Sequence, residues 1–444
     1  MILKNSTYIL CIALTSISLT ACSSMNPFKG KEDAPLPGKR ISILELEQEL
    51  KPDSVTHSQT QDYIPPQAWE NEQWPQHGGY PTHAMQNLAL DTSSLEQKWS
   101  VSIGKGATQR LPLTAQPIVT TELIITLDTH ASVKAFKREN GDKVWETSTL
   151  PENEDEAAIG GGISYANNLL YVTNGFGEIL ALGPRDGQIK WRKSLSSPAR
   201  AAPTSLTNIL YVQLLDNTLL ALRTHDGSEI WRYSSFSENS GLVGAASPAA
   251  NNDIVIAAFS SGEISHLDAE QGTVKWSHSL APRRRLGGIG SLSDVIALPV
   301  IDHNSVYGIG FGGQMARYDL HTGQPAWQRE IASIETPWVA GERLFVTTLD
   351  NQLASIDKQS GNILWITDLK TIKNAKSAEI WTGPIMGNGN ILVASSGGKL
   401  AEISAKDGKL LQIYKAPGPV STPPVIAGKT LYILSDNGKL AAYQ

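Results

Sequence analysis

The chain of 444 residues has a formal net charge of −6, with 18% charged residues, 41% hydrophobic residues, 38 glycines and 24 prolines. A nucleic-acid binder needs a concentrated basic surface, so this composition excludes a general nucleic-acid-binding role. The many glycines and prolines indicate frequent tight turns rather than long helices, which favours an all-β fold.

The N-terminus has the features of an export signal. Lys4 precedes an apolar run from Tyr8 to Leu19, which is too short to cross a bilayer comfortably and is interrupted by hydroxyl residues. We therefore interpret residues 1–21 as a signal peptide. Cys11 lies inside this segment and Cys22 is the only other cysteine, so the chain without its signal has no disulfide.

A proline-containing segment follows the signal. Residues 22–68 lack a sustained apolar pattern and are predicted to form a tether. Within this tether, residues 41–50 alternate apolar and polar side chains and fit either a short strand or a helical turn. The prolines of the tether are Pro27, Pro35, Pro37, Pro52, Pro65 and Pro66.

One repeat dominates residues 69–444. A glycine is followed four residues later by a tryptophan six times, and a seventh copy at Gly408 has Gln412 in place of the tryptophan. Successive glycines are 38 to 51 residues apart, a spacing typical of a four-stranded propeller blade. The six complete pairs are Gly141 and Trp145, Gly187 and Trp191, Gly227 and Trp231, Gly272 and Trp276, Gly323 and Trp327, and Gly361 and Trp365.

Each copy of the repeat predicts four strands joined by tight turns. In one copy these are residues 201–206, 209–215, 218–223 and 229–234. The repeat glycine lies in the turn before the fourth strand, where a positive φ is required, and the tryptophan is expected to fill the wedge between blades. Proline recurs in the first strand and cannot donate to a central ladder, so it marks this strand as the innermost one, with an unpaired edge facing the channel.

Counting the fourth strands predicts eight blades. They contain the six tryptophans of the repeat, Gln412, and a lone Trp99 that has no glycine before it. After Gln412 the chain supplies only three more strands, so the strand around Trp99 is expected to complete the last blade. The prediction is an all-β, eight-bladed propeller over residues 69–444, closed by pairing of its N- and C-terminal strands.

Catalytic signatures are scarce, and we expect no catalytic residue, metal or cofactor. The chain has no HExxH motif, no paired CxxC and no G-x-S-x-G elbow. The glycines at 310–313 and 396–398 fall in expected turns between second and third strands, which explains them without a phosphate. His77 and His83 stand near Trp74, but no third ligand candidate is nearby, so we expect surface or capping groups.

Two charged loops lie in expected connections between blades. Residues 283–285 are three consecutive arginines, and residues 152–156 contain four acidic side chains. A charge run usually serves solvation. Connections between blades are nevertheless where a rigid propeller displays contacts to partners, so Arg283, Arg284 and Arg285 are candidate partner-binding residues.

Two patterns resemble known families. Leu19-Thr20-Ala21-Cys22 is similar to the lipobox of bacterial lipoproteins, which implies lipidation of Cys22, and Ser23 then implies sorting to the outer membrane. The strings ALGPRDGQIKW, ALRTHDGSEIW and SIDKQSGNILW resemble the repeat of pyrroloquinoline-quinone-like propellers. Together with the lipobox and the tether, they resemble the BamB family, the propeller lipoproteins of the bacterial β-barrel assembly machinery, over almost the whole chain.

This resemblance implies a non-enzymatic scaffold at the periplasmic face of the outer membrane. Members of that family bind the periplasmic repeats of the central barrel-assembly subunit, BamA, and assist insertion of outer-membrane β-barrels. Asp294 matches an acidic contact position of the family, and Leu242 matches an apolar one. Ile296 and Val243 depart from the family pattern, which has an acid and an arginine there, and Arg283 to Arg285 could supply the lost positive charge.

Two alternatives remain open from the sequence. A quinoprotein dehydrogenase would place a quinone and Ca²⁺ on the propeller axis, although the chain shows no assembled acid cluster for Ca²⁺ and little length beyond the propeller. A periplasmic propeller that binds a solute or a polysaccharide is the second alternative.

Overall fold

The computed structural model describes residues 50–54, 63–91, 94–154, 158–236, 242, 244–281, 292–373 and 378–444. Every described strand lies in the unit from Leu50 to Gln444. The signal peptide, Cys22, Ser23 and all of the segment 41–50 except Leu50 therefore lie outside the described residues.

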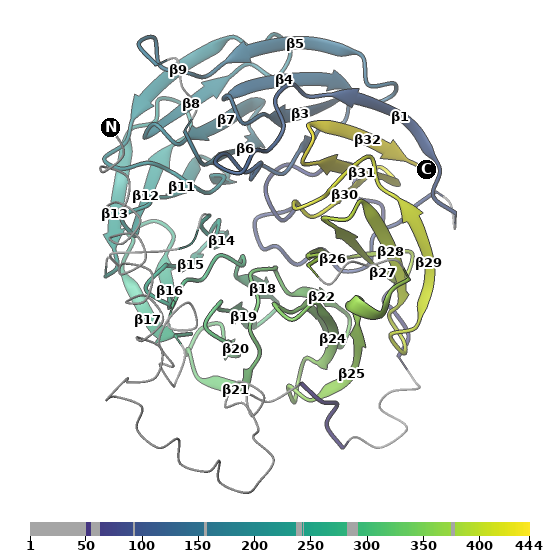
Figure 1. Cartoon of the computed structure of the whole chain (residues 1–444). Helices are drawn as coiled ribbons and strands as arrows, with labels where there is room; N and C mark the ends of the chain where they lie inside the picture. The colour runs from purple at the N-terminus through teal and green to yellow at the C-terminus, as the bar shows by residue number, and fades with distance from the viewer. Residues whose placement is uncertain are drawn as a thin grey trace, which may run out of the picture. The chain divides into compact units, whose positions relative to one another are not determined.

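The unit from Leu50 to Gln444 is built from eight four-stranded antiparallel sheets that follow one another around a central channel (Figure 1). This arrangement confirms the predicted eight-bladed, all-β propeller. In chain order the first four blades are β2 Ile118–Val119, β3 Leu123–Leu127, β4 Ser132–Lys137, β5 Lys143–Ser148; β6 Gly161–Ala166, β7 Leu169–Asn174, β8 Glu178–Leu182, β9 Ile189–Ser194; β10 Thr204–Leu206, β11 Ile209–Gln213, β12 Thr218–Arg223, β13 Glu229–Ser234; and β14 Ala249–Ala250, β15 Ile254–Ala258, β16 Glu263–Asp268, β17 Val274–Ser279.

The remaining blades repeat the same order, with a short 3-10 helix, η2 Leu369–Thr371, after the sixth. They are β18 Val300–Asp302, β19 Ser305–Ile309, β20 Gln314–Asp319, β21 Pro325–Glu330; β22 Trp338–Ala340, β23 Arg343–Thr347, β24 Gln352–Asp357, β25 Ile363–Asp368; β26 Trp381–Gly387, β27 Asn390–Ser395, β28 Lys399–Ser404, β29 Leu410–Lys415; and β30 Val425–Ala427, β31 Thr430–Ser435, β32 Lys439–Tyr443, β1 Gln97–Ser102.

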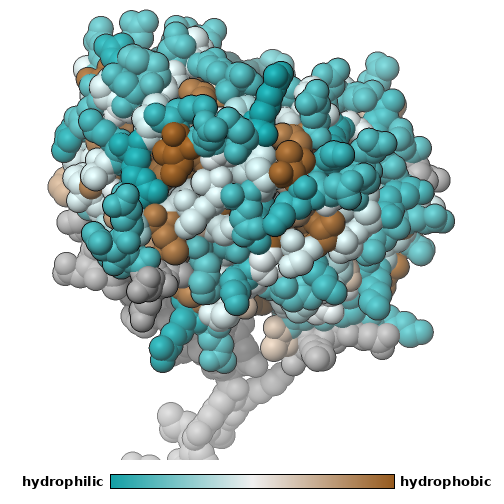
Figure 2. All heavy atoms as spheres, turned by 90° about the horizontal axis from the view of Figure 1, so that it is seen from above, coloured by the Kyte–Doolittle hydropathy of each residue, from teal (hydrophilic) through white to brown (hydrophobic). Residues whose placement is uncertain are grey.

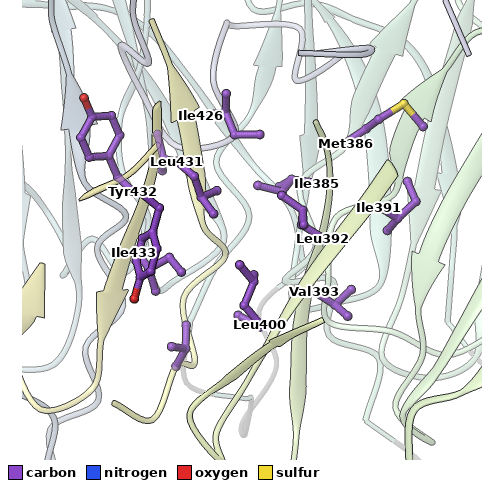
Figure 3. Close-up of a cluster of buried hydrophobic side chains, with 14 of the residues drawn as sticks. Ile385, Met386, Ile391, Leu392, Val393, Leu400, Ile426, Leu431, Tyr432 and Ile433 are labelled. Atoms are coloured by element: carbon purple, nitrogen blue, oxygen red, sulfur yellow. The ribbon is translucent and has the colours of Figure 1, made fainter. Parts of the chain in front are cut away.

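The two ends of the propeller close the ring as expected. β1 is the outermost strand of the eighth blade and pairs with β32, with Trp99 opposite Ala442. Glu96 and Gln444 exchange backbone hydrogen bonds beside this pair. Figure 3 shows that apolar side chains of the seventh blade, such as Leu392, face those of the eighth, such as Leu431, so the buried core continues across the junction next to the seam.

Proline precedes the innermost strand of most blades. Pro117, Pro203, Pro248, Pro299, Pro337 and Pro424 each stand one residue before it. The exceptions are Pro384, which lies within β26, and the second blade, where β6 begins at Gly161. The prediction that the proline-bearing strand is innermost is confirmed, and proline acts mainly at the residue where the chain turns into that strand.

The repeat glycine and tryptophan pack against each other between neighbouring blades rather than within one blade. A Cβ placed on Gly272 would lie 2.5 Å from Cδ2 of Trp231, the tryptophan of the preceding blade, and the φ of Gly272 is +69°. The same contact joins Gly141 to Trp99, Gly187 to Trp145, Gly227 to Trp191, Gly323 to Trp276, Gly361 to Trp327 and Gly408 to Trp365. Glycine is therefore required at this position for two reasons: the backbone φ is positive, and the indole that covers it leaves no room for a Cβ atom.

The indole N–H groups tie the blades together as well. Trp231 donates to the carbonyl of Ala269 in the next blade at 3.0 Å, and Trp276 donates to that of Leu320 at 2.9 Å. The indoles of Trp145, Trp191 and Trp327 make equivalent bonds of 2.8 to 3.2 Å to Pro184, Thr224 and Lys358. Each of these five indoles thus fills the wedge and satisfies its donor with the same neighbour, whereas Nε1 of the repeat tryptophan Trp365 is buried without a hydrogen-bond partner.

Gln412 is the exception that this packing explains. It pairs with Glu402 at the strand position that tryptophan occupies in the other blades, yet its side chain is exposed. The eighth blade has no turn between its third and fourth strands, because the chain ends at Gln444 and the fourth strand is β1. No repeat glycine is therefore present for an indole to cover.

The outermost strands form a polar rim. Figure 2 views the molecule from above the orientation of Figure 1 and shows mainly hydrophilic atoms, with hydrophobic ones in separate spots. Large apolar side chains exposed on these strands are Val144, Ile189, Val274, Leu410 and Leu411, at most two to a blade. The described part of the rim thus presents isolated apolar residues, which are ordinary on a soluble surface.

Candidate functional site

A non-repeating segment crosses the central channel. Residues 69–91, called the axial segment here, lie inside the ring of innermost strands (Figure 1). Three large apolar side chains of the axial segment, Trp74, Met85 and Leu88, are at most 1% exposed. The indole of Trp74 donates to Oε1 of Gln116, whose amide group in turn donates to the carbonyl of Pro423 in the connection that leads into the eighth blade.

The axial segment is hydrogen-bonded to all eight blades, close to the turn that ends each innermost strand. The bonds join Trp74 to Val119, Pro75 to Tyr165, Gln76 to Ser205, Pro81 to Ala250, Thr82 to Ile301, Gln86 to Trp338 and Gly341, Leu88 to Met386 and Asn388, and Asn71 to Ile426 and Gly428. Most of these bonds use backbone groups on one or both sides. The expectation that the channel-facing edges are unpaired is therefore wrong at these positions.

His83 is buried in the channel, which corrects the expectation of a surface or capping role. It is 3% exposed, and Nδ1 lies 2.7 Å from the carbonyl of Pro299, so Nδ1 carries the proton and donates. Burial lowers the pKa of His83 to about 4, and the nearby His77 contributes in the same direction. His77 is partly buried, and desolvation also lowers its pKa to about 4.

Acidification is expected to destabilise the propeller through His83. The pKa is about 4 in the folded chain and 6.5 in the unfolded chain, so the unfolded state gains a proton first as the pH falls. Stability is then lost between pH 6.5 and pH 4, by about 3 kcal/mol for a depression of this size. Urea unfolding at pH 7 and pH 4 measures it.

His83→Asn is the matched variant for this measurement. His83 has a φ of +61°, which asparagine tolerates well, and the asparagine amide can donate where Nδ1 does. The pH dependence of the variant should be smaller than that of the wild type by about 3 kcal/mol. Identical pH profiles for the two proteins would contradict a buried neutral His83.

The channel residues do not fit a quinone with Ca²⁺. The axial segment lies in the channel where a quinone would bind, and its buried side chains there include no carboxylate. Across the described ranges, no three His, Cys, Asp or Glu side chains are grouped so that they could hold a metal ion. Hard cations such as Ca²⁺ need several oxygen ligands, so this donor set does not suit one.

The inter-blade connections and the turns between second and third strands share one face of the ring, called the connection face here. Leu242 and Asp294 lie on neighbouring connections of this face, and the backbone N–H of Leu242 donates to Oδ1 of Asp294 at 2.9 Å. The structure thus brings these two candidate residues together across 52 positions of sequence. Asp294 is 4% exposed and also accepts from Phe311 N through its backbone carbonyl, so it holds the loop of Leu242 in place.

Exposed apolar side chains on the connection face were missed by the sequence reasoning. Phe236 is 84% exposed, while its carbonyl is held by the amide of Asn217, two residues from the exposed Leu215. A large side chain that is exposed on a hydrogen-bonded backbone is a frequent anchor of protein interfaces. No repeat marks Phe236, so only its exposure identifies it.

A second group of apolar residues lies on the connection face of the sixth and seventh blades. Ile334, Leu349 and Ile380 are 38%, 38% and 62% exposed. A backbone hydrogen bond from Leu349 N to the carbonyl of Ala332 joins the loops of Leu349 and Ile334, and one from Ser396 N to the carbonyl of Ile380 holds the loop of Ile380 against the β27–β28 turn.

Carboxylates next to this second group are engaged within the protein. Glu335 accepts hydrogen bonds from the Thr382 hydroxyl and the Gly383 N–H, and burial raises its pKa to about 7. Glu379 forms an ion pair with Lys399 at 2.7 Å. Glu335 thus joins the connection into the sixth blade to β26 of the seventh, and Glu379 joins the connection into the seventh blade to β28 of the same blade.

Several candidates cannot be placed. Arg283, Arg284, Arg285 and Val243 lie outside the described residues, and the acidic loop is described only as far as Glu154. The turn assignments at residues 310–313 and 396–398 are confirmed, since both lie between second and third strands.

The described part of the tether contacts the sixth blade. Asp53 N donates to the carbonyl of Ile363 at the start of β25, and the Asp53 carboxylate accepts from Ile363 N and lies 3.5 Å from Arg329. Tyr63 donates to the carbonyl of Ala340 and stacks under the guanidinium of Arg343. Residues 50–54 and 63–68 therefore pack on the propeller.

None of the helices in the described residues is long and apolar enough to cross a membrane.

The amino-acid sequence of this chain is similar to those of known proteins. A family model described as outer membrane protein assembly factor BamB matches residues 129–367 and 350–444. The chain is similar to the outer membrane protein assembly factor BamB of Yersinia pestis, with 24% identity over 352 residues that cover 78% of this chain and 88% of that protein.

Two solved structures show the fold that the chain shares. The crystal structure of BamB from Moraxella catarrhalis is 20% identical with a TM-score of 0.68, covering 79% of this chain and 100% of that one. Quinohemoprotein alcohol dehydrogenase from Comamonas testosteroni is 11% identical with a TM-score of 0.66, covering 85% of this chain and 81% of that one. BamB and an alcohol dehydrogenase therefore share this propeller fold, so the fold alone does not distinguish their functions.

Proposed function

The chain belongs to the BamB family of outer membrane protein assembly factors, and from this we propose that it is a non-enzymatic scaffold that binds the periplasmic repeats of a BamA-type barrel-assembly subunit. Through that contact it assists the insertion of outer-membrane β-barrel proteins. It works by binding alone, as a rigid ring that presents loops of its connection face to the partner.

The observation that carries this proposal is the filled axis. In the quinoprotein alternative the chemistry would take place on the axis, where this chain instead places its own Trp74, Met85 and Leu88. The proposed binding function is therefore assigned to the outer surfaces of the ring. The geometry favours neither a dehydrogenase nor an axial solute-binding site.

The proposed contact surface is the part of the connection face formed by the third, fourth and fifth blades. Leu242 supplies an apolar contact, Asp294 fixes the Leu242 loop through the 2.9 Å hydrogen bond, and the exposed ring of Phe236 lies on the connection that leads toward this loop. We further propose that Arg283, Arg284 and Arg285 contribute positive charge to the same surface. An aromatic anchor beside charged residues is the usual composition of an interface hot spot.

Attachment to the membrane is proposed to run through Cys22. Lipidation of Cys22 would anchor the chain in the outer membrane on the periplasmic side, with Ser23 permitting that sorting. Several acyl chains hold a protein stably, whereas one holds it weakly. We further propose that residues 22–68 act as the tether between the lipid and the propeller.

Affinity capture of the full-length lipoprotein from mildly solubilised membranes tests the proposal. We expect recovery of the BamA-type subunit with the wild type and at least a tenfold loss with Phe236→Asp or Leu242→Asp, because a buried unpaired charge weakens an interface strongly. Charge reversal of the three arginines should also reduce recovery. Cys22→Ser should move the protein to the soluble fraction without removing its ability to bind the partner.

Glu270→Lys is the matched control, because Glu270 is exposed on the opposite face, in the turn before β17. It should leave capture unchanged. Equal capture by the wild type and by all the connection-face variants would refute the proposed surface. Dye-linked alcohol oxidation after addition of quinone and Ca²⁺ would refute the non-enzymatic assignment.

A further inference from the structure

The central channel has the properties of a binding site for a peptide. Eight short strands present their backbone edges to it, and the axial segment uses groups of all eight. Most of these contacts are backbone bonds, such as Val119 N to the carbonyl of Trp74 and Ala250 N to that of Pro81. Backbone bonding supplemented by a few side-chain pockets is how sheet edges recognise extended peptides.

Three side chains of the axial segment serve as anchors. Trp74 is 1% exposed and directs its N–H to Gln116, Met85 is 1% exposed, and Leu88 is fully buried against the seventh blade. By contrast Glu72, two residues before Trp74, and Tyr80, between Trp74 and Met85, are exposed. The segment therefore resembles a bound ligand, with buried anchors and a few solvent-facing residues.

The contacts also tie the first blade to its neighbour across the closure of the ring, the eighth blade. Arg138 of the first blade donates to the carbonyl of Glu72 and to the Tyr432 hydroxyl of the eighth blade. Gln116 bonds Trp74 and Gly78 on one side and Pro423 on the other. Because one short segment holds positions all around the ring, loss of any anchor should loosen contacts on distant blades as well.

We propose that the channel is a peptide-binding site which the chain fills with its own residues 69–88, and that this segment binds as one cooperative unit that closes the ring a second time. The first closure is the β1–β32 pair. The ligand class is a polypeptide with tight turns, such as those closed by Gly79 N to the Gln76 carbonyl and His83 N to the Tyr80 carbonyl, that carries an indole, a thioether and an aliphatic anchor. The proposal stands whether or not the chain binds a BamA-type subunit.

Hydrogen exchange of the full chain tests cooperativity. The amides of Val119, Tyr165, Ala250, Ile301 and Gly428 donate to the axial segment from five blades. In the wild type they should be protected as well as amides within the blades. In Trp74→Ala all five should exchange at least tenfold faster, although Ala250 and Ile301 bond to residues seven and eight positions away from Trp74.

Leu88→Ala and Glu72→Ala complete this test. Leu88→Ala weakens the other end of the segment and should accelerate the same five amides, which separates cooperativity from local damage at Trp74. Glu72→Ala changes an exposed side chain and should leave them protected. Acceleration confined to the amides next to each substitution would overturn the proposal.

Peptide exchange tests the site itself. A protease site introduced between the exposed residues Asp91 and Ser94 allows the folded full chain to be cut after folding. An isotope-labelled peptide of residues 50–91 in excess should then replace the cut segment, as mass spectrometry of the native complex would show. The Glu72→Ala peptide should enter equally well, and the Trp74→Ala peptide at least tenfold less. Equal entry of both peptides, or no retention of any segment after cutting, would overturn the proposal.

Discussion

Gly272→Ala is expected to lower the free energy of unfolding by about 4 kcal/mol. About 2 kcal/mol comes from forcing a side chain into the left-handed region, since φ is +69°, and about 2 kcal/mol comes from overpacking against Trp231. The added Cβ would lie 2.5 Å from the indole, which is wedged between blades and has little room to move. Denaturant unfolding followed by circular dichroism measures the loss.

Gly313→Ala is the control that separates these two contributions. Gly313 also has a positive φ, +98°, but the nearest atom to an added Cβ is 4.0 Å away. It should therefore lose only the backbone contribution, about 2 kcal/mol. Trp231→Leu combined with Gly272→Ala should show a coupling energy of about 1–2 kcal/mol, because the smaller side chain relieves the clash. Equal losses of stability in the Gly272 and Gly313 variants, with no coupling energy, would show that the contact between Gly272 and the indole does not contribute to stability.

Trp276→Ala is expected to lower the free energy of unfolding by about 3–5 kcal/mol, the usual cost of removing a buried tryptophan. The indole is 8% exposed, covers Gly323 of the next blade and donates to the Leu320 carbonyl. The Leu320 carbonyl also lies 2.9 Å from Nδ1 of His266, so it keeps a hydrogen-bond partner in the variant. The loss of stability therefore comes from the cavity that the missing indole leaves.

The seventh blade provides the matched control for this substitution. Gln412 occupies the same strand position, opposite Glu402, but its side chain is exposed. Gln412→Ala should change stability by no more than about 0.5 kcal/mol. A large loss of stability in Gln412→Ala, or a small one in Trp276→Ala, would contradict the structural role assigned to the repeat tryptophans.

The fold was predictable because its information is periodic and local. A turn glycine with a tryptophan four residues later marks a hairpin of adjacent strands, so spacing alone counts the blades. The missing fourth strand after Gln412 and the lone Trp99 then required closure by the chain ends, as the β1–β32 pair confirms. The partner of each tryptophan was not predictable in the same way, because Trp231 covers a glycine of the next blade rather than its own.

The candidate site was predictable only in part. The family pattern pointed to Leu242 and Asp294, which the structure joins by a hydrogen bond, but it did not indicate that the Asp294 side chain is buried. Phe236 carries no repeat or motif, and only its 84% exposure singles it out. His83 was expected at the surface, because nothing in its neighbouring residues shows that the segment enters a channel.

By itself the sequence determined the all-β class, the eight blades and the closure by the chain ends, because hydrophobic periodicity and turn chemistry act between residues close in the chain. Only the tertiary structure decided what fills the axis. The axial segment does not repeat, and it is held largely through backbone groups, which every residue carries and no sequence pattern records. Its binding depends on eight strand edges meeting in space, and those edges come from blades spread over more than 300 residues of chain.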